Sequence, residues 1–366
     1  MHHRRIGSGY IGASGARGFS IVELMVAVAI SLLLLTGVVA IFVSSKTSYE
    51  TNERFSRIEE NGRFALDAIM TDLRASGFVG CARQPTYLST SLNSATSLQW
   101  NFLAGPVTGF QATGTNTWSP AMDTFIASPL SGSDVLVARV PVRERVAFPL
   151  TANVGAPTND LQVAAGSSGG VLTGDIAMAY SCEAISVFQV SSYTQGTGVI
   201  VHAANTAGQT PRNANNTVNY SYRQAVTNVV PIETVAYYIA PALRVTDATD
   251  PAPAGTTSLW RRRGNIAAEE LVEGIEQMQV QYGVDTTGDV IVDAYRTADQ
   301  VQADGQWNDV LSVSVALLVS SLEQYGTDTD QRTYTLLDVN VAAPADRRLR
   351  EVFTATASIR NRVRVN

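Results

Sequence analysis

The sequence has few of the residues on which enzyme chemistry most often depends. It contains three His, two of them within the first three positions, so His202 is the only one in the rest of the chain. A Ser-His-Asp unit or a His-based metal site would depend on that single side chain. We therefore expect no enzyme, no metal site and no cofactor. Lysine is equally scarce, because Lys46 is the only one among 26 basic residues, which we attribute to codon bias.

Three further stretches contain the right residue types for a ligand site but lack the required pattern. The Gly-rich residues 166–174 have no Lys and no helix pattern after them, so they do not form a phosphate loop. The three Asp of residues 285–293 miss the spacing of a calcium loop, and we expect a hairpin tip with solvated carboxylates there. A strand over residues 260–264 would divide its three Arg between two faces, which favours a solvated edge over a site for DNA or lipid.

Acidic residues are absent from the first 18 positions, which carry three Arg. Without residues 1–18, 23 basic side chains face 32 acidic ones. A surface that binds nucleic acid needs clustered Lys and Arg. The acidic balance therefore argues against a nucleic-acid partner.

Only two cysteines occur, Cys81 and Cys182. In an exported protein such a pair predicts a disulfide. Closing a loop of about 100 residues would stabilise the fold by roughly 4–5 kcal/mol in the chain-entropy model. The alternative is two unrelated buried thiols.

No charged residue occurs from Leu24 to Ser45. A helix over this segment is about 33 Å long, enough to cross a bilayer. The run is too long for a secretory signal peptide, and no A-x-A pattern follows it. The basic residues Arg4, Arg5 and Arg17 precede it, so the N-terminus should stay in the cytoplasm. A simple single-pass anchor, however, does not explain the carboxylate of Glu23 at its start.

The stretch Gly18-Phe19-Ser20-Ile21-Val22-Glu23-Leu24 resembles the cleavage and methylation motif of the prepilins. This resemblance implies that residues 1–18 are a leader, cut by a prepilin peptidase between Gly18 and Phe19. Phe19 would become N-methylphenylalanine. In that family the Glu is thought to pair with an N-terminal amine in the filament, where the low dielectric strengthens the attraction. Glu23 would then set the register of assembly.

The helix should continue past the apolar run. Apolar residues recur at three- and four-residue steps over 46–77, as in an amphipathic helix. Gly77 offers a C-cap. One helix over 19–76, with no Pro, would be about 87 Å long: its half 19–45 would lie in the membrane or filament core, and its half 46–77 would pack on a sheet. The expected stripe comprises Phe55, Ile58, Gly62, Ala65, Leu66, Ile69 and Leu73.

Residues 78–366 read mostly as strands. The segment 309–321 alternates apolar residues with Ser, which predicts a half-buried antiparallel strand. Residues 83–132 are rich in Ser, Thr, Asn, Gly and Pro and suggest a loop-rich insertion. We therefore expect an α+β fold in which the helix packs on an antiparallel β-sheet head, as in pilins. The other expected strands cover 134–142, 175–180, 184–193, 233–240, 275–285, 333–341 and 352–363.

Several phrases of the head resemble the PilW-type minor pilins of the type IV pilus. They include GSDVLVARV, GDIAMAYSCEAISVFQV, VAYYIAP, SLWRRR, ELVEGIEQMQVQYGVD and IRNRV. The resemblance implies a subunit that helps to prime pilus assembly. The size of the head favours the tip or a sparse position, because a head this large fits poorly at every position of a filament wall. Its partners would be other minor pilins, the major pilin, a tip adhesin and the prepilin peptidase. It would lie in the inner membrane with a periplasmic head before assembly, and in the surface pilus afterwards.

Three alternatives remain open. A minor pseudopilin of a type II secretion system shares the N-terminal motif, although its head is usually shorter. A DNA-capturing competence pilin is disfavoured by the acidic balance of the chain. A plain membrane-anchored binding protein would retain residues 1–18.

Overall fold

The computed structural model describes residues 18–81, 87–247, 249 and 252–359. The chain divides into two compact units, Met1–Arg54 and Phe55–Asn366. The second unit is called the head below. The basic residues expected to orient the chain, Arg4, Arg5 and Arg17, lie outside the described residues.

The described residues form one long helix, one short helix and 19 strands. The helices are α1 (Ile21–Ala75) and α2 (Ala298–Ala303), with 3₁₀ turns at Leu243–Thr246 and Trp307–Asp309. The strands are β1 (Tyr87–Thr90), β2 (Val107–Gly114), β3 (Thr117–Ser119), β4 (Val135–Pro141), β5 (Phe148–Pro149), β6 (Leu161–Gln162), β7 (Ile176–Tyr180), β8 (Ala184–Gln189), β9 (Ser192–Thr194), β10 (Val199–Val201), β11 (Asn228–Pro241), β12 (Thr257–Arg263), β13 (Glu269–Glu273), β14 (Ile275–Val284), β15 (Ala294–Arg296), β16 (Val310–Ser320), β17 (Thr333–Leu336), β18 (Val339–Ala342) and β19 (Arg350–Ser358). The expected α+β class is confirmed.

Helix α1 follows the expected span within two residues at its N-terminal end and one at its C-terminal end. Its first part is long and apolar enough to cross a membrane, judged by length and composition. Every side chain from Phe19 to Val43 is exposed. The helix ends before Gly77, which has a φ of 68° and donates its N–H to the carbonyl of Arg139 at 3.0 Å. A positive φ favours glycine, so the expected C-cap role fits this position.

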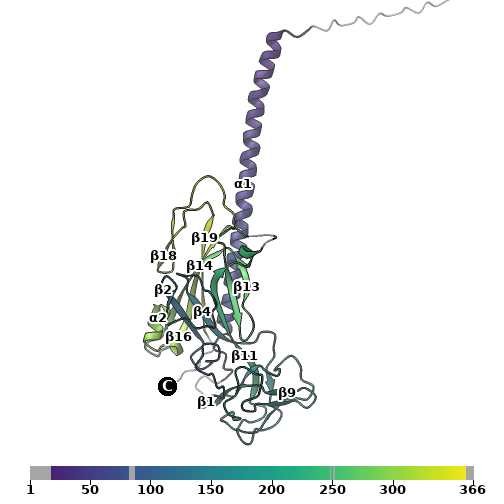
Figure 1. Cartoon of the computed structure of the whole chain (residues 1–366), viewed down its shortest axis with the longest axis vertical. Coiled ribbons are helices and arrows are strands. Elements are labelled where there is room, and N and C mark those ends of the chain that lie inside the picture. The colour runs from purple at the N-terminus through teal and green to yellow at the C-terminus, as the bar shows by residue number, and fades with distance from the viewer. Residues whose placement is uncertain (1–17, 82–86, 248, 250–251, 360–366) are drawn as a thin grey trace, which may run out of the picture. The chain divides into compact units, whose positions relative to one another are not determined.

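Strand β11 organises the larger sheet of the head. Its first residues pair with β5 and β7, and its second half pairs with β4 and β12. The sheet has ten strands, with the main order β1-β8-β7-β11-β4-β2-β3. Strands β5 and β12 also pair with β11, and β13 pairs with β12. Its ladders are antiparallel except for the parallel pair β1–β8. Within the head, β11 thus runs from the region of β1 and β9 toward that of β4 (Figure 1).

The smaller main sheet has the order β15-β14-β16-β19 and is antiparallel. The expected direction of β16 is correct, but the expectation that it is half-buried is wrong, because all eleven of its residues are buried. One face carries Val313, Val315 and Leu317 into the main core. The other face carries Ala316 and Leu318 under the β17–β18 hairpin. That hairpin replaces the single strand expected over 333–341, and its turn holds Leu337 at a φ of 56°.

Residues 55–75 of α1 pack against both main sheets of the head. The buried stripe runs from Ile58 to Leu73 and joins residues of β4, β11, β14 and β16 in one core. The expected stripe is correct except at Phe55, which is 39% exposed. Gly62 lets the helix approach β19 closely, because a Cβ there would lie 2.6 Å from the ring of Phe353.

The region 83–132 contains three strands among its described residues. β2 pairs with β4 through four residues of each strand, so it belongs to the ten-stranded sheet. β1 extends the same sheet beside β8. The remaining described residues of this region, apart from the short β3, are mostly turns and irregular segments. The polar composition therefore marks the connections between strands, while Val107 and Phe110 of β2 are buried.

Candidate functional site at the N-terminal motif

The motif around Gly18 and Phe19 leads directly into α1. The Oγ of Ser20 accepts the N–H of Val22 at 3.3 Å, and Oε2 of Glu23 accepts the N–H of Ser20 at 3.0 Å. This reciprocal pair is a variant of the capping box, with Ser20 at the N-cap and Glu23 three residues later, in which Ser20 binds the N–H of the second helical residue and not the third. It satisfies two backbone N–H groups that have no partner inside the helix. Glu23 therefore stabilises the helix start as well as carrying a charge.

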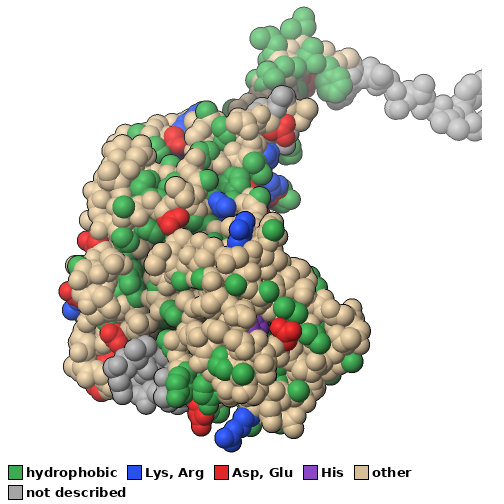
Figure 2. All heavy atoms as spheres, turned by 60° about the horizontal axis from the view of Figure 1, so that its bottom comes forward, with side chains coloured by type: hydrophobic (Ala, Val, Ile, Leu, Met, Phe, Trp, Pro, Cys, Tyr) green, Lys and Arg blue, Asp and Glu red, His purple; other side chains and the backbone are tan. Residues whose placement is uncertain are grey.

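The carboxylate of Glu23 is surrounded by exposed apolar side chains. Phe19 is 88% exposed, and Ile21 and Leu24 are also exposed. In Figure 2 the side chains beside the grey N-terminal residues are mostly hydrophobic. Among the described residues, no cation lies within ion-pair distance of Glu23. An exposed apolar helix of this length is unfavourable in water and fits an apolar environment.

At the other end of α1, a buried acid attaches the helix to the head. Asp72 accepts hydrogen bonds from Nε of Arg143 at 2.9 Å and from the hydroxyl of Tyr237 at 2.6 Å. The same hydroxyl lies 3.1 Å from the carbonyl of Ala68, one turn earlier. Burial, followed by the charge of Asp72, raises the pKa of Tyr237, so the phenol stays protonated and donates. The helix is thus held in one register against β11.

The disulfide Cys81–Cys182 is present, as expected. Cys81 lies six residues after the end of α1, and Cys182 lies in the turn between β7 and β8. The bridge therefore ties the segment after the helix to the ten-stranded sheet.

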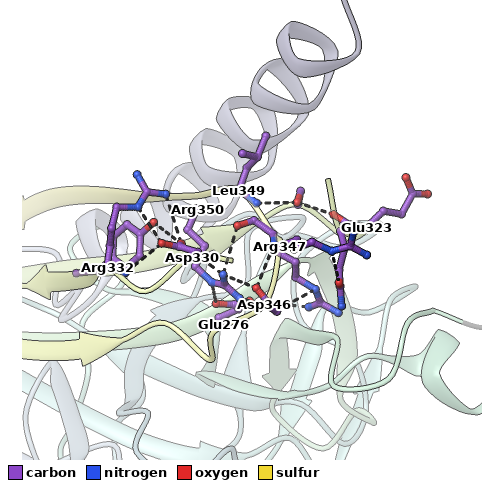
Figure 3. A network of polar contacts seen from close by, with 12 residues as sticks. Glu276, Glu323, Asp330, Arg332, Asp346, Arg347, Leu349 and Arg350 are labelled. Atoms are coloured by element: carbon purple, nitrogen blue, oxygen red, sulfur yellow. Dashed lines mark hydrogen bonds and ion pairs between the residues drawn. The ribbon is translucent and has the colours of Figure 1, made fainter. Parts of the chain in front are cut away.

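A network of charged side chains connects the loops before β17 and β19 to the strands of the smaller main sheet. Arg350 binds Glu276 of β14 through Nε at 2.6 Å and Nη2 at 2.9 Å. It binds Asp346 through Nη1 at 2.7 Å and Nη2 at 2.9 Å. Asp330 accepts hydrogen bonds from Arg332 and from the hydroxyl of Tyr334. Figure 3 shows these residues converging around Arg350 from separate loops and strands.

The network lowers the pKa of two of its carboxyl groups. Burial by itself would raise the pKa of Asp330, but the hydrogen bonds from Arg332 and Tyr334 outweigh it and hold the pKa well below its usual range. The hydrogen bond from Arg350 also lowers the pKa of Asp346. Both carboxylates are charged at neutral pH and fix the β17–β18 hairpin to β19. The network therefore stabilises this part of the fold.

The loop between β14 and β15 is the expected hairpin tip, with Asp289 and Asp293 exposed, but Asp285 differs from the expected solvated carboxylates. Asp285 is buried, and its two oxygens accept the N–H groups of Gly288 at 2.6 Å and Val290 at 2.9 Å. Asp293 accepts the N–H of Thr286 at 2.7 Å. These carboxylates hold the loop backbone. Among the described residues, no group of three or more His, Cys, Asp or Glu is placed to hold a metal ion.

The three Arg of residues 260–264 also differ from expectation. They lie on β12, which pairs with β11 and β13, so the expected strand edge is wrong. Each Arg binds another part of the head instead of facing solvent freely. The partners are Glu269 for Arg261, the carbonyl of Phe125 for Arg262, and Glu233 with Glu144 for Arg263. The remaining His of the chain, His202, is buried, and its Nε2 lies 3.0 Å from the carbonyl of Asn159.

Sequence reasoning overlooked the capping role of Ser20 and the buried anchor at Asp72. The first has a local signal, Ser followed three residues later by Glu. The second also has one, because Asp72 interrupts the apolar stripe of the helix. Its partners Arg143 and Tyr237 lie far away in sequence and have no local signal. The same holds for Arg350 and Glu276.

Two family models match the chain. One, described as Type IV Pilus-assembly protein W, covers residues 236–361. The other, described as Prokaryotic N-terminal methylation motif, covers residues 14–39. No curated protein and no solved structure matches. The first region runs from the second half of β11 through β19, and the second contains the capping box. The chain accordingly resembles the type IV pilus-assembly proteins of the PilW kind over its C-terminal third, and it carries the N-terminal methylation motif of pilus-related pilins at the start of α1.

Proposed function

We propose that this protein is a minor pilin that takes part in type IV pilus assembly, acting as a primer at the tip. It is a filament subunit and not an enzyme. The observation that carries the proposal is that one acid, Glu23, directly precedes a run of 22 uncharged residues at the start of α1. Capping the helix start needs only a side-chain oxygen, so an ordinary anchor has no use for the negative charge of Glu23, whereas a filament subunit has one. The PilW match over residues 236–361 supports a minor pilin in particular.

In this proposal the prepilin peptidase cuts between Gly18 and Phe19 and methylates Phe19. The new amine then lies one residue before Ser20, whose N–H already binds Glu23. Within an assembled filament, Glu23 pairs with such an amine, its own or a neighbour's. The charge pair is worth more there than in water because the surroundings are apolar. Only one axial offset between neighbouring helices brings the two charges together, so the pair fixes the register.

The proposed precursor spans the inner membrane through residues 24–45, with its N-terminus in the cytoplasm and its head in the periplasm. After assembly the subunit lies in the surface pilus, in contact with other minor pilins, the major pilin and a tip adhesin. No nucleic-acid partner is proposed. The arginines of β12, which would be the obvious candidates, already bind groups of the head.

The proposal is tested first by mass spectrometry of the N-terminal peptide, comparing inner membranes with sheared surface filaments. A methylated peptide beginning at Phe19 in the filaments, together with the major pilin, is the expected result. The same peptide confined to the membrane would contradict the surface location and favour a pseudopilin of a secretion system. An N-terminus upstream of Gly18 in both fractions would contradict the pilin function.

The role of Glu23 is tested by Glu23→Gln, which keeps a capping oxygen and removes the charge. We expect normal membrane insertion and cleavage, with at least a tenfold loss of the subunit from sheared filaments. Glu59→Gln is the matched control, because Glu59 is an exposed acid on the same helix. Equal incorporation of both variants would contradict the charge pairing.

A further inference from the structure

Arg139 is a buried arginine without an acidic partner. It lies on β4, is 5% exposed and points between the strands and the loop before β2. Its Nη1 donates to the carbonyl of Gly105 at 3.0 Å, and both Nη atoms lie 3.4 Å from Oγ1 of Thr108. Its Nε has no hydrogen-bond partner. Among the described residues, no carboxylate lies within ion-pair distance of this guanidinium.

This arrangement contrasts with Arg350, another buried arginine of the head. Arg350 faces Glu276 and Asp346 through paired hydrogen bonds. A buried cation without such a partner costs several kcal/mol. Burial lowers the pKa of Arg139 to about 10, so the side chain still carries its charge at neutral pH. The site therefore has an uncompensated positive charge.

Two hollows meet at this guanidinium. One has a volume of about 70 Å³ and is lined mainly by apolar side chains, among them Phe78, Leu88, Leu103, Met178 and Ile185. The other has a volume of about 220 Å³ and a mixed lining that includes Thr96, Asn101, Asp123 and Gln302. The apolar hollow has room for roughly two waters or a group of a few carbons. Its apolar lining favours the carbon group.

We propose that Arg139 binds a carboxylate whose short aliphatic group occupies the apolar hollow. Nε and Nη2 lie on one edge of the guanidinium. Nε has no hydrogen-bond partner, and Nη2 has only the 3.4 Å contact with Oγ1 of Thr108. A carboxylate accepts two parallel hydrogen bonds from such an edge. The negative charge belongs beside Arg139, since Asp123 in the polar hollow repels it. The ligand is either a free short-chain acid or the aliphatic C-terminal residue of a polypeptide.

The test uses the full chain in uncharged maltoside micelles and saturation-transfer NMR titrations at neutral pH. Isovalerate is the free-acid probe, and isovaleramide is its uncharged counterpart. N-acetyl-glycyl-valine and its C-terminal amide probe the polypeptide source. We expect at least one of the two acids to bind, and to bind at least tenfold more tightly than its own amide. The acid that binds more tightly shows whether the ligand is a free short-chain acid or a polypeptide C-terminus.

Arg139→Gln should weaken binding of the acid at least tenfold and leave the amide unchanged. Arg262→Gln is the matched control, because Arg262 also donates to a backbone carbonyl but lies outside both hollows. Leu103→Trp fills the apolar hollow, keeps Arg139 and should also abolish binding. If neither acid binds the wild type, or if acids and amides bind alike, the proposal is wrong. This comparison needs no variant, so it stands even if Arg139→Gln does not fold.

Discussion

Asp134 is a single residue that connects the two main sheets. Its oxygens accept the N–H of Ala112 on β2 at 2.9 Å and the N–H of Val280 on β14 at 3.0 Å. Burial raises its pKa to about 7, although these two hydrogen bonds work in the opposite direction. The folded protein therefore keeps a proton on Asp134 at a pH where the unfolded chain has lost it.

This proton makes stability depend on pH. Between about pH 4 and pH 7 the folded state binds more protons than the unfolded state at this position, so stability falls as pH rises, by up to about 1.4 kcal/mol per pH unit. Asp134→Asn should remove that contribution to the slope while lowering stability by about 1–2 kcal/mol, because the amide nitrogen cannot accept one of the two N–H groups. Urea unfolding followed by tryptophan fluorescence at several pH values measures both effects. Asp160→Asn, at an exposed position, should retain the wild-type slope, and an equal slope in all three proteins would refute the assignment.

Asp72 is the second position at which one residue has a large expected effect. Asp72→Ala removes the acceptor of Arg143 and Tyr237 inside the head, and we expect a loss of about 2–4 kcal/mol in the free energy of unfolding. The loss should stay below that of a fully buried pair because the side chain of Arg143 is 37% exposed and water can reach it. Glu59→Ala, on an exposed face of the same helix, should change stability by less than about 0.5 kcal/mol. A similar small change for Asp72→Ala would show that the buried contacts contribute little.

These residue-scale features differ in how far they could be predicted. The helix start at Ser20 and Glu23 depends on neighbours three residues apart, so its chemistry is visible in the sequence. Asp72 is visible only as an anomaly, an acid in an apolar stripe. Asp134 is less visible still, because its pKa depends on burial between strands that the chain brings together from distant positions.

At the scale of elements, the contact between α1 and β19 depends on one glycine. Gly62 faces the ring of Phe353, and this contact sets how closely the helix approaches the sheet. Glycine lowers the stability of a helix interior by about 1 kcal/mol relative to Ala. Its presence in the middle of a long helix is therefore explained by packing.

Gly62→Ala should consequently destabilise the head by about 1–3 kcal/mol despite the better helix propensity of Ala, because the new methyl group overlaps the ring. The double variant Gly62→Ala/Phe353→Ala should lose less free energy of unfolding than the sum of the losses of the two single variants, because the new methyl group no longer meets the ring. A double-mutant cycle from urea unfolding measures this coupling. Additive effects of the two substitutions would contradict a direct steric contact.

The sequence pattern predicted the elements that alternate clearly, such as β4, β7, β14 and β16. It could not predict that β16 is covered on both faces, because the covering hairpin follows it in sequence and folds back over Ala316 and Leu318. It also did not identify β13 or the first residues of β12, two strands whose charged residues bind one another. Short strands within polar segments, such as β1 and β3, have too few residues to show a period.

At the scale of the whole molecule, the disulfide is the covalent link between distant parts of the chain. Cys81 and Cys182 are separated by 101 residues in sequence. Replacing both by Ser should lower the free energy of unfolding by roughly 4–5 kcal/mol in the chain-entropy model. Urea unfolding of the wild type with and without reductant, compared with the double Ser variant, measures this. The double variant should be insensitive to reductant, and equal stability of all samples would contradict a stabilising role.

The same bridge has a mechanical consequence for a subunit that is pulled by its helix. The chain reaches Cys81 six residues after α1 ends, and from there the disulfide leads directly to the turn between β7 and β8. A pulling force applied to α1 therefore reaches these strands through covalent bonds, and the chain between the two cysteines lies outside this path. A second path runs through Tyr237 into β11, which continues without interruption to its pairing with β7. Both paths lead to β7. A tensile load should therefore be shared between the disulfide and the hydrogen bonds that pair β11 with β7, which would be pulled along the direction of the strands.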